Sequence, residues 1–298
     1  MRPVIGLTVG AVALGVACVG WGFAEAHAFT TRRVTVPVLG RGAAPIRVLH
    51  ISDLHFTPSQ RDKVAWVASL ANEAPDLVVV TGDNLGHVDA VPTVAEALAP
   101  LLGTPGLFVF GSNDYVGPRP VNPFAYFGGP SRMHGDRVRL PTEKLRSVFT
   151  DAGWKDLNNA RAGLRVAGIE VTAVGMDDPH VGRDAMPSPD GERGSLHLGV
   201  VHAPYARALT ALGDDAVDMM FAGHTHGGQV CVPGFGALVT NCDLDRARVK
   251  GLSSWPGAYG DPESTWLHVS AGAGTSPYAP VRFACRPEAT VLTLVAKG

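Results

Sequence analysis

The chain has 298 residues, of which 46% are hydrophobic and 17% are charged, a composition that excludes intrinsic disorder and predicts a buried core. The 25 Lys and Arg residues nearly balance the 27 Asp and Glu residues, which gives a formal net charge of −2. This balance excludes the broad basic surface that nucleic-acid binding requires, so we expect no nucleic-acid partner.

The N-terminal residues 4–23 carry no charge, and a run of this length is sufficient to cross the hydrocarbon core of a membrane. A cleavable signal peptide has a shorter apolar region of about 7–15 residues, although residues 24–26 and 26–28 both fit the small-residue cleavage pattern. We therefore expect a single-pass transmembrane anchor over residues 1–24. A cleaved signal segment is the alternative, and a polar junction follows over residues 25–45.

The four cysteines include no C-x-x-C pair, which excludes a zinc knuckle and a thioredoxin-type motif. Cys231 and Cys242 flank a Pro/Gly turn and an apolar run, a pattern that predicts a hairpin able to bring them together. A disulfide there would indicate an exported domain, and two buried free thiols are the alternative. We expect the catalytic domain to be extracytoplasmic, or secreted if the N-terminal segment is cleaved.

From residue 46 onward, short β-branched runs bounded by Gly, Pro or Asp predict strands, and longer segments between them predict helices. The predicted strands cover residues 46–51, 77–80, 107–110, 166–174 (a hairpin broken at Gly168), 196–201, 217–221, 266–269 and 290–295. The predicted helices cover residues 60–72, 93–101, 142–152 and 204–212. Alternating strands and helices followed by strands alone predict a mixed α/β architecture in one domain over residues 46–298.

Most of these strands end in a carboxylate, an imidazole or an amide. Residues i and i+2 of an extended stretch point to the same side, so Asp53 and His55 are able to share one target, and His224 and His226 form a second pair with the same spacing. Ligands of α/β sheets bind beyond the carboxyl ends of the strands, so we expect these side chains to converge. The candidate metal ligands are Asp53, His55, Asp83, Asn113, His202, His224 and His226.

Oxygen and nitrogen donors without thiolate favour Mn, Fe or Zn over copper(I) or an iron–sulfur cluster. The donors are too many for one ion, and a carboxylate such as Asp83 is able to bridge two cations about 3.5–4 Å apart. Two-metal sites of this kind activate water and clamp the oxygens of a phosphoryl group. The sequence therefore predicts two divalent metal ions and hydrolysis of a phosphate mono- or diester by metal-activated water.

The order of the motifs resembles the signature of the calcineurin-like metallophosphoesterases. The matching motifs are Asp53-x-His55, Gly82-Asp83, the Gly111 loop, His202 and Gly223-His-x-His226. The resemblance extends from Ile46 nearly to the C-terminus and implies a four-layer αββα sandwich of two mixed sheets. The chain is most similar to the membrane-anchored bacterial branch that includes enzymes acting on UDP-2,3-diacylglucosamine, which implies a lipid or cell-envelope substrate.

The resemblance also divides the ligands into two sets that share Asp83. One set comprises Asp53, His55, Asp83 and His226, and the other comprises Asp83, the Gly111 loop, His202 and His224. The family usually has Gly-Asn-His-Asp where this chain has Gly-Ser112-Asn113-Asp114. A gapless match places Ser112 at the metal-binding amide and Asn113 at the catalytic histidine, whereas a shift of one residue brings Asn113 to the metal.

Catalytic roles are expected for Asn113, Asp114 and His202. Since the family's general-acid imidazole is missing from its usual position, the proton for the leaving group comes from elsewhere; His134 and His180 are candidates, and each also fits an ordinary surface histidine. Arg282 is a candidate for pairing with substrate phosphate. The alternative function is a catalytically degenerate, metal-binding membrane protein with a binding role.

Overall fold

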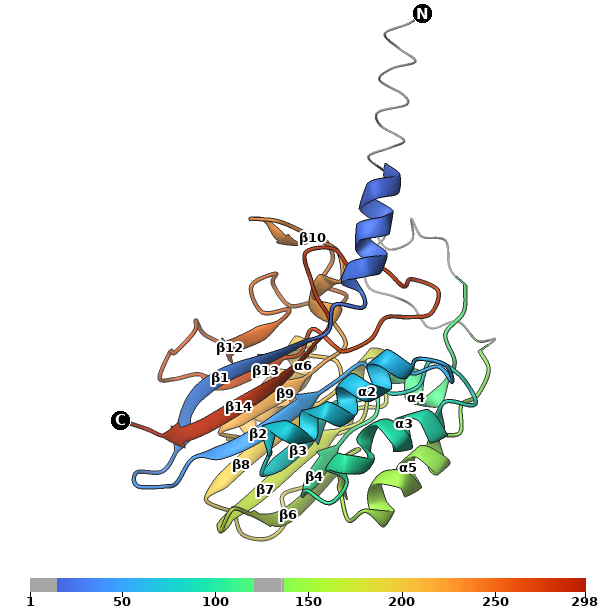
Figure 1. The fold of residues 1–298 in the computed structure, drawn as a ribbon. Helices are drawn as coiled ribbons and strands as arrows, with labels where there is room; N and C mark the ends of the chain where they lie inside the picture. Colours follow the sequence, from blue (N-terminus) through green and yellow to red (C-terminus); the bar gives the residue numbers. More distant parts are fainter. Residues whose placement is uncertain (1–14, 121–134, 136) are drawn as a thin grey trace, which may run out of the picture.

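The computed structural model describes residues 15–120, 135 and 137–298, which form two six-stranded sheets packed face to face (Figure 1). The first sheet has the strand order β1-β14-β2-β3-β4-β5. Its strands are β1 (Thr30–Leu39), β2 (Ile46–Ile51), β3 (Leu77–Val80), β4 (Gly106–Phe108), β5 (Lys155–Asp156) and β14 (Glu288–Ala296). β2 to β5 run parallel to one another, whereas β14 is antiparallel to β2 and parallel to β1.

The second sheet has the strand order β12-β13-β9-β8-β7-β6. Its strands are β6 (Ala160–Val166), β7 (Ile169–Met176), β8 (Leu196–Val201), β9 (Met219–Ala222), β12 (Gly251–Trp255) and β13 (Thr265–Val269). The four central strands are parallel, and the edge strands β6 and β12 pair antiparallel with their neighbours. A separate hairpin joins β10 (Cys231–Val232) to β11 (Gly236–Ala237).

Helices cover the outer face of each sheet (Figure 1). α2 (Arg61–Ser69), α3 (Val91–Leu98) and α5 (Thr142–Asp151) pack on the first sheet, and α6 (Ala206–Asp214) packs on the second. The shorter helical segments are α4 (Ser112–Tyr115), η1 (Leu70–Glu73), η2 (Ala99–Leu101), η4 (Pro179–Val181) and η5 (His226–Gly228). The expected mixed α/β architecture is confirmed.

The two-residue period of a strand explains how the layers hold together. In β2, Leu49 and Ile51 pack against the helices, whereas Ile46 and Val48 pack into the core between the sheets. All four side chains are at most 1% exposed. Strands buried on both faces form near-continuous apolar runs, which explains why residues 46–51 were readable as a strand from the sequence.

Residues 25–45, expected to be a junction, contain the unpredicted strand β1. Arg32, Arg33 and Pro37 obscure its apolar pattern, yet β1 lies at the edge of the sheet, where proline and charged side chains are tolerated. The strand pairs with β14, which lies more than 250 residues further along the chain. The segment before residue 46 is therefore part of the first sheet rather than a tether to it.

The predicted membrane anchor over residues 1–24 lies largely outside the described residues, which begin at residue 15. Residues 15–25 form a helix that projects from the body of the molecule (Figure 1). Among the described residues, no helix combines the length and apolar character that crossing a membrane requires.

The end of this N-terminal helix is fixed to the segment that precedes β14. The carboxylate of Glu25 accepts hydrogen bonds from the backbone N–H groups of Ala284 (3.0 Å) and Cys285 (2.7 Å). The carbonyl oxygen of Gly22 accepts a further hydrogen bond from the backbone N–H of Arg282 (3.0 Å). Two backbone amide groups, one of them in the buried residue Cys285, therefore depend on a carboxylate from the N-terminal helix.

Of the two alternatives for Cys231 and Cys242, the structure shows two buried free thiols and not a disulfide. In the β10–β11 hairpin, Cys231 lies opposite Ala237, so the turn is tighter than the sequence suggested and Cys242 falls outside it. Cys242 packs with the α6 layer, whereas Cys231 packs in a small cluster with Cys285.

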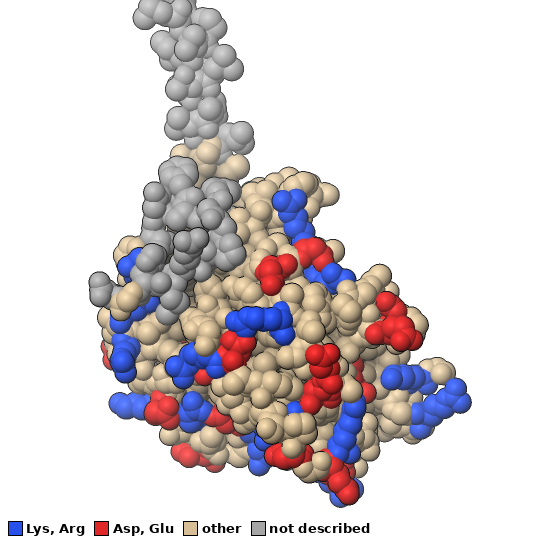
Figure 2. Space-filling model, turned by 180° about the vertical axis from the view of Figure 1, so that it is seen from behind, with Lys and Arg blue, Asp and Glu red and all other residues tan. Residues whose placement is uncertain are grey.

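Charged side chains are spread over the described surface without segregation by sign. On the face shown in Figure 2, Lys and Arg side chains are interspersed with Asp and Glu side chains. Several form ion pairs, including Arg161 with Asp215 (2.6 Å) and Arg193 with Asp218 (3.1 Å). The Arg193–Asp218 pair is partly exposed and contributes little to stability, about 0–1 kcal/mol, whereas the Arg161–Asp215 pair is largely buried.

Candidate metal centre

The candidate ligands follow the carboxyl ends of strands from both sheets, and the packing of the sheets brings these ends together. The side chains in question are Asp53 and His55 after β2, Asp83 after β3, Asn113 after β4, His202 after β8, and His224 and His226 after β9. Two groups have all their ligand atoms within 4.8 Å of one another: Asp53 with His55 and His226, and Asp53 with Asp83 and His202.

In the first group, the Nε2 atoms of His55 and His226 lie 3.2 Å apart. Asp53 Oδ1 lies 3.6 Å from His226 Nε2. The Nδ1 atom of His226 lies 3.2 Å from both the carbonyl oxygen of Gly274 and the Nη2 atom of Arg282, so these two groups orient the ring and leave its Nε2 atom directed toward His55. Two imidazole nitrogens that face each other beside a carboxylate fit a divalent cation.

Burial controls the protonation of these groups. It lowers the pKa of His55 to about 4 and that of His226 well below its ordinary value, so both rings are neutral, the form that ligates metals. Burial raises the pKa of Asp53 to about 6, with His202 opposing the rise. Because His55 and His226 are neutral, their contacts with the neighbouring carboxylates are those of metal ligands and not those of salt bridges.

Asp83 lies between His55 of the first group and His202 of the second. Its Oδ2 atom is 3.6 Å from His55 Nε2 and its Oδ1 atom is 3.6 Å from His202 Nε2. Burial alone raises the pKa of Asp83, but the adjacent His202 and His55, with hydrogen bonds from Asn113, hold it below its ordinary range. A carboxylate with one oxygen directed to each group has the position of a bridging ligand.

His202 is fully buried, and its Nδ1 atom donates to the carbonyl oxygen of Thr81 (2.5 Å). Its Nε2 atom has no hydrogen-bond partner among the described residues. Burial lowers the pKa of His202, but Asp83, Asp178 and Asp53 outweigh it and raise the pKa to about 9. A metal cation bound to Nε2 would balance the charge of these carboxylates, as the second ring proton of His202 does in its absence. The donor set therefore fits a metal.

His224 stands beside His202, with ring centroids 5.2 Å apart. Its Nε2 atom lies 3.0 Å from the carbonyl oxygen of Asn241, which assigns the proton to Nε2 and leaves the Nδ1 lone pair as the ligand atom. Burial lowers the pKa of His224 well below its ordinary value. The ring is therefore neutral and oriented by a backbone carbonyl, as metal-binding histidines usually are.

The altered loop after β4 brings Asn113 against the bridging carboxylate. Its backbone N–H donates to Asp83 Oδ1 (2.8 Å) and its side-chain Nδ2 donates to Asp83 Oδ2 (2.7 Å). Gly111 permits this approach, because a Cβ atom there would lie 2.3 Å from Asp83 Oδ1 and 2.6 Å from His202 Nε2. Ser112 is also buried, at 5% exposure.

Asp114 has a structural role and not the catalytic one expected from the sequence. Its fully buried carboxylate accepts backbone N–H groups from Asp83 (2.8 Å), Asn84 (2.8 Å) and Gly111 (3.1 Å). Burial, reinforced by Asp83, raises its pKa to about 7, while the backbone hydrogen bonds oppose the rise. Asp114 therefore joins the β3 and β4 loops and fixes the backbone that carries Asp83 and Asn113.

The backbone of the site is strained. Asp53, His55, Asp83, His224 and His226 all have positive φ angles, between 42° and 69°, a region that non-glycine residues seldom occupy. Each such residue costs about 1–3 kcal/mol, and such residues cluster at functional sites. Hydrogen bonds between loops, such as Asp53 N to the Gly82 oxygen (2.9 Å), hold this backbone in place.

Arg282 is fully buried, so it is not available to substrate phosphate as the sequence suggested. Its Nη2 atom donates to the carbonyl oxygens of Ala271 (2.7 Å), Gly272 (3.0 Å) and Gly274 (2.7 Å). The Gly274 oxygen is also the acceptor that orients His226. Arg282 therefore positions the ligand His226 both directly, from Nη2 to Nδ1 at 3.2 Å, and through the Gly274 carbonyl, and the sequence offered no signal for this role.

A second buried cation supports the loop after β2, and the sequence analysis missed it. Lys63, only 4% exposed, extends from α2 and donates to the carbonyl oxygens of Leu54 (2.5 Å) and His55 (3.4 Å). Its ammonium group also lies 4.7 Å from the centre of the Phe56 ring. Burial lowers the pKa of Lys63 to about 7, with Arg282 adding to the effect.

Of the two proton-donor candidates, His134 lies outside the described residues. His180 lies at the site, with its ring centroid 4.5 Å from that of His224 and its Nδ1 atom 3.0 Å from the Tyr205 hydroxyl. Burial lowers the pKa of His180, and His202 adds to the effect. The structure therefore brings one of the two candidates into contact with the predicted ligands.

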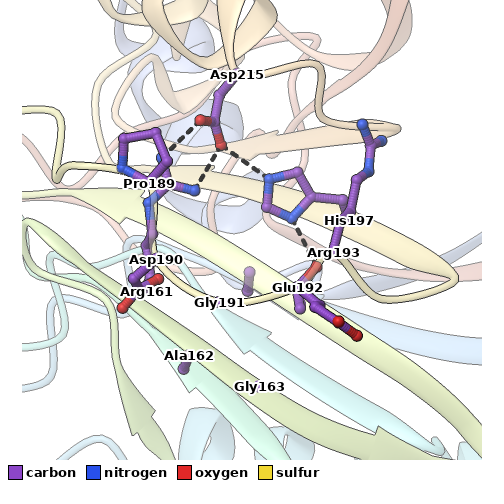
Figure 3. Close-up of a pocket in the computed structure, with 12 residues that line it drawn as sticks. Arg161, Ala162, Gly163, Pro189, Asp190, Gly191, Glu192, Arg193, His197 and Asp215 are labelled. Carbon is purple, nitrogen blue, oxygen red and sulfur yellow. Dashed lines mark hydrogen bonds and ion pairs between the residues drawn. The ribbon is translucent and has the colours of Figure 1, made fainter.

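A cavity of about 510 Å³ lies away from this cluster, beside β6, β7 and β8 (Figure 3). Its polar groups satisfy one another, because Arg161 donates two hydrogen bonds to Asp215 (2.8 and 2.6 Å) and His197 Nε2 lies 2.8 Å from the same carboxylate. His197 Nδ1 lies 2.9 Å from the Thr172 hydroxyl. This second cluster is internally paired.

Comparisons with known proteins agree with the geometry of the metal cluster. A family profile described as calcineurin-like phosphoesterase matches residues 46–228. An uncharacterized metallophosphoesterase of Bacillus subtilis, YkuE, is 26% identical over 96% of this chain and 94% of its own length. The phosphodiesterase YaeI of Escherichia coli is 29% identical, covering 85% of this chain and 83% of the relative.

A more distant relative carries a more specific name. The UDP-2,3-diacylglucosamine pyrophosphatase LpxG of Chlamydia trachomatis is 24% identical over 82% of this chain and 82% of its own length. The profile match extends from the first residue of β2 through His226. It therefore contains all seven candidate ligands and ends before the segment that carries Arg282.

Proposed function

The chain belongs to the calcineurin-like phosphoesterase family and is a metal-dependent phosphoester hydrolase, and on this premise we propose that it hydrolyses a phosphate mono- or diester at a site for two divalent cations. The observation that carries the proposal is the pair of opposed Nε2 atoms of His55 and His226, 3.2 Å apart and flanked by carboxylate oxygens. Two neutral imidazoles are able to share one hydrogen bond, but with the carboxylate oxygens beside them they also form the set of nitrogen and oxygen donors that a divalent cation takes.

We assign the ligands in two sets that share Asp83. Asp53, His55, Asp83 and His226 hold one cation, and Asp83, Asn113, His202 and His224 hold the other. Manganese, iron and zinc all suit these oxygen and nitrogen donors. Bound cations of this kind supply Lewis acidity toward phosphoryl oxygens and increase the acidity of water.

The chain's own residues fix the geometry and the protonation of the site. The Gly274 carbonyl and Arg282 contact Nδ1 of His226, and the Thr81 carbonyl accepts from Nδ1 of His202, so that both Nε2 atoms face carboxylates. Asn113 donates to Asp83 from two atoms and thereby sets the plane of the bridging carboxylate. Asn113 replaces the family's acidic imidazole, so proton delivery to the leaving group falls to another donor.

The test uses metal content and turnover together. We expect two equivalents of Mn²⁺ per chain at saturation, and hydrolysis of an aryl phosphate mono- or diester that stops when the metal is chelated. Binding of two ions without turnover of either aryl ester, or of any member of a lipid phosphoester panel, would instead identify a degenerate metal-binding protein. A chain that binds no divalent ion contradicts both functions.

For the physiological substrate we propose a lipid-linked or cell-envelope phosphoester. The name of the chlamydial relative, a UDP-2,3-diacylglucosamine pyrophosphatase, supports this class at low identity. The uncharged residues 4–23 support a retained single-pass anchor over residues 1–24 and an extracytoplasmic catalytic domain over residues 46–298. Turnover of nucleotide-sugar lipids and phospholipids in mixed micelles tests the substrate, and protease accessibility in intact cells tests the location.

A further inference from the structure

Asp178 is a carboxylate at the metal-binding edge that the predicted ligand sets do not include. Strand β7 ends at Met176, which pairs with Val201 at the end of the parallel strand β8. His202 follows Val201 directly, and Asp178 follows Met176 by two residues. Asp178 therefore belongs to one more strand end at the same edge of the second sheet.

The side chain of Asp178 is fully buried and only half paired. Its Oδ1 atom accepts the backbone N–H of His180 (2.9 Å). Its Oδ2 atom has no hydrogen-bond partner among the described residues. A buried carboxylate oxygen without a partner destabilises the fold, so this atom marks a place for a donor or a cation.

The preceding residue, Asp177, provides an internal contrast. Its Oδ1 atom accepts the Tyr115 hydroxyl (2.9 Å) and the backbone N–H of Asp178 (2.7 Å). Its Oδ2 atom accepts the guanidinium of Arg183 (2.8 Å). Adjacent carboxylates at one strand end thus differ in kind: Asp177 is occupied by protein donors, and Asp178 retains an open oxygen.

Asp178 lies next to the second ligand set. It accepts the backbone N–H of His180, whose ring centroid is 4.5 Å from that of His224, a member of that set. His202 Nε2 is itself a buried atom without a hydrogen-bond partner among the described residues. Both unpaired atoms, Asp178 Oδ2 and His202 Nε2, are therefore donors that a divalent cation accepts. In the gapless alignment, the second set also lacks the family's Asn at position 112, where this chain has Ser112.

From this juxtaposition, and resting on the proposed two-metal function, we propose that Asp178 supplies a carboxylate oxygen to the second cation, held with Asp83, His202 and His224. Carboxylate oxygen suits the same cations as the rest of the set. It also adds negative charge where a neutral serine hydroxyl is a weak substitute for an amide carbonyl. This carboxylate from the end of β7 adds to Asn113 in the second set and compensates for Ser112 after β4.

The test compares the full-length chain with Asp178→Asn and its matched control Asp177→Asn, by equilibrium dialysis with Mn²⁺. We expect two ions in the wild type, a second ion weakened about 10–100-fold in Asp178→Asn, and wild-type affinities in Asp177→Asn. Unchanged affinity for both ions in Asp178→Asn overturns the inference. A wild type that binds no ion refutes the underlying function instead, so the two failures are distinct.

Thermal unfolding in chelator separates ligation from a structural role. Asn keeps an acceptor for the His180 N–H and removes a buried charge, so we expect Asp178→Asn to be at least as stable as the wild type without metal. A metal-free variant that is less stable than the wild type, with metal affinity reduced only in proportion, assigns Asp178 to the fold and overturns the inference.

A spectroscopic variant keeps the test decisive if the amide disturbs folding. Thiolate ligands select soft metals, so Asp178→Cys should gain affinity for Cd²⁺ and show a thiolate-to-cadmium charge-transfer band in the ultraviolet. Asp177→Cys supplies the background from the four native cysteines. Bands of equal strength in the two cysteine variants contradict the assignment.

Discussion

Two clusters of histidine and aspartate lie on the second sheet, and they differ in how their atoms are paired. In the cluster of Figure 3, both ring nitrogens of His197 have partners, and Asp215 is held by Arg161. At the metal centre, His202 is bonded only through Nδ1, and its Nε2 atom faces Asp83 at 3.6 Å. The cluster beside the 510 Å³ cavity is complete without a ligand, whereas the cluster at the strand ends is not.

The difference follows from where each histidine lies on the same strand. His197 is inside β8, where neighbouring strands and an arginine surround its ring. His202 comes just after β8 ends, where the backbone leaves the sheet and several loops meet. A functional site is therefore indicated by buried atoms that the protein leaves unpaired, and cavity volume alone does not indicate it.

The largest expected effect comes from the bridging carboxylate. Asp83→Asn removes the charge that both groups share, so we expect both ions to be weakened by more than about 100-fold, beyond the range for supporting residues. Aryl phosphate hydrolysis should be lost at any practical Mn²⁺ concentration. Equilibrium dialysis with metal analysis measures the affinity, and retention of one tightly bound ion would assign the bridge to Asp53.

A smaller effect is expected from Arg282→Met, which leaves the ligands intact and removes the group that holds the Gly274 carbonyl. We expect about a 10–100-fold loss of metal affinity, the usual range for residues that orient a ligand. Arg282→Lys should recover only part of it, because an ammonium lacks the planar fork that reaches several carbonyls. Wild-type metal affinity in Arg282→Met would show that the loop holds itself.

The altered loop after β4 should give an effect of about 10-fold. Asn113 contacts both oxygens of Asp83, so Asn113→Ala should weaken the second ion by about that factor, and Ser112→Ala should leave its affinity unchanged. Isothermal titration with Mn²⁺ measures both variants. The reverse outcome, in which only Ser112→Ala weakens metal binding, restores the gapless alignment with the family.

The smallest effect on metal is expected from the paired cluster. Asp215→Asn should change metal affinity by less than about twofold, since distant sites act independently within about 0.5 kcal/mol. It should nevertheless lower the free energy of unfolding by about 1–3 kcal/mol, because Arg161 and His197 lose a charged partner. Urea unfolding of the metal-free protein measures the loss, and a metal-affinity loss comparable to that of Asn113→Ala would erase the distinction between the clusters.

The paired cluster should also contribute to acid sensitivity. Burial raises the pKa of Asp215, but Arg161 and His197 outweigh it and hold the pKa below the ordinary value of 3.8. A depressed carboxyl pKa stabilises the fold above the unfolded pKa, and the contribution is lost as the pH falls through the folded pKa. The stability difference between wild type and Asp215→Asn should therefore shrink below pH 3.8, as acid unfolding followed by circular dichroism would measure.

The sequence predicted the residues that follow readable strands and missed those that act through the backbone. Asp53, His202 and His226 were identifiable because each follows a short apolar run. Lys63 and Arg282 bind backbone carbonyls, which leave no mark on residue spacing. The roles of Lys63 and Arg282 were therefore predictable only from the positions of the loops in the structure.

The end of strand β7 and the edge strand β1 were the parts of the fold that the sequence did not predict. The hairpin around Gly168 was expected to end at residue 174, but β7 continues to Met176, so the residues that follow it were not recognised as a strand end. Strand β1 was missed because its partner β14 is distant in sequence. Pairing across such distances is set by the tertiary fold and not by local pattern.

The carboxylate of Glu25 determines where the chain can be shortened to produce a soluble enzyme. A chain that starts at Ile46 lacks β1 and exposes an edge of β14, which invites aggregation. A chain that starts at Thr30 restores the sheet but leaves the amides of Ala284 and Cys285 without their acceptor, next to Arg282. A truncated chain that lacks the apolar segment should therefore begin before Gly22. It then keeps the Glu25 contacts next to Arg282 and, with them, its capacity to bind metal.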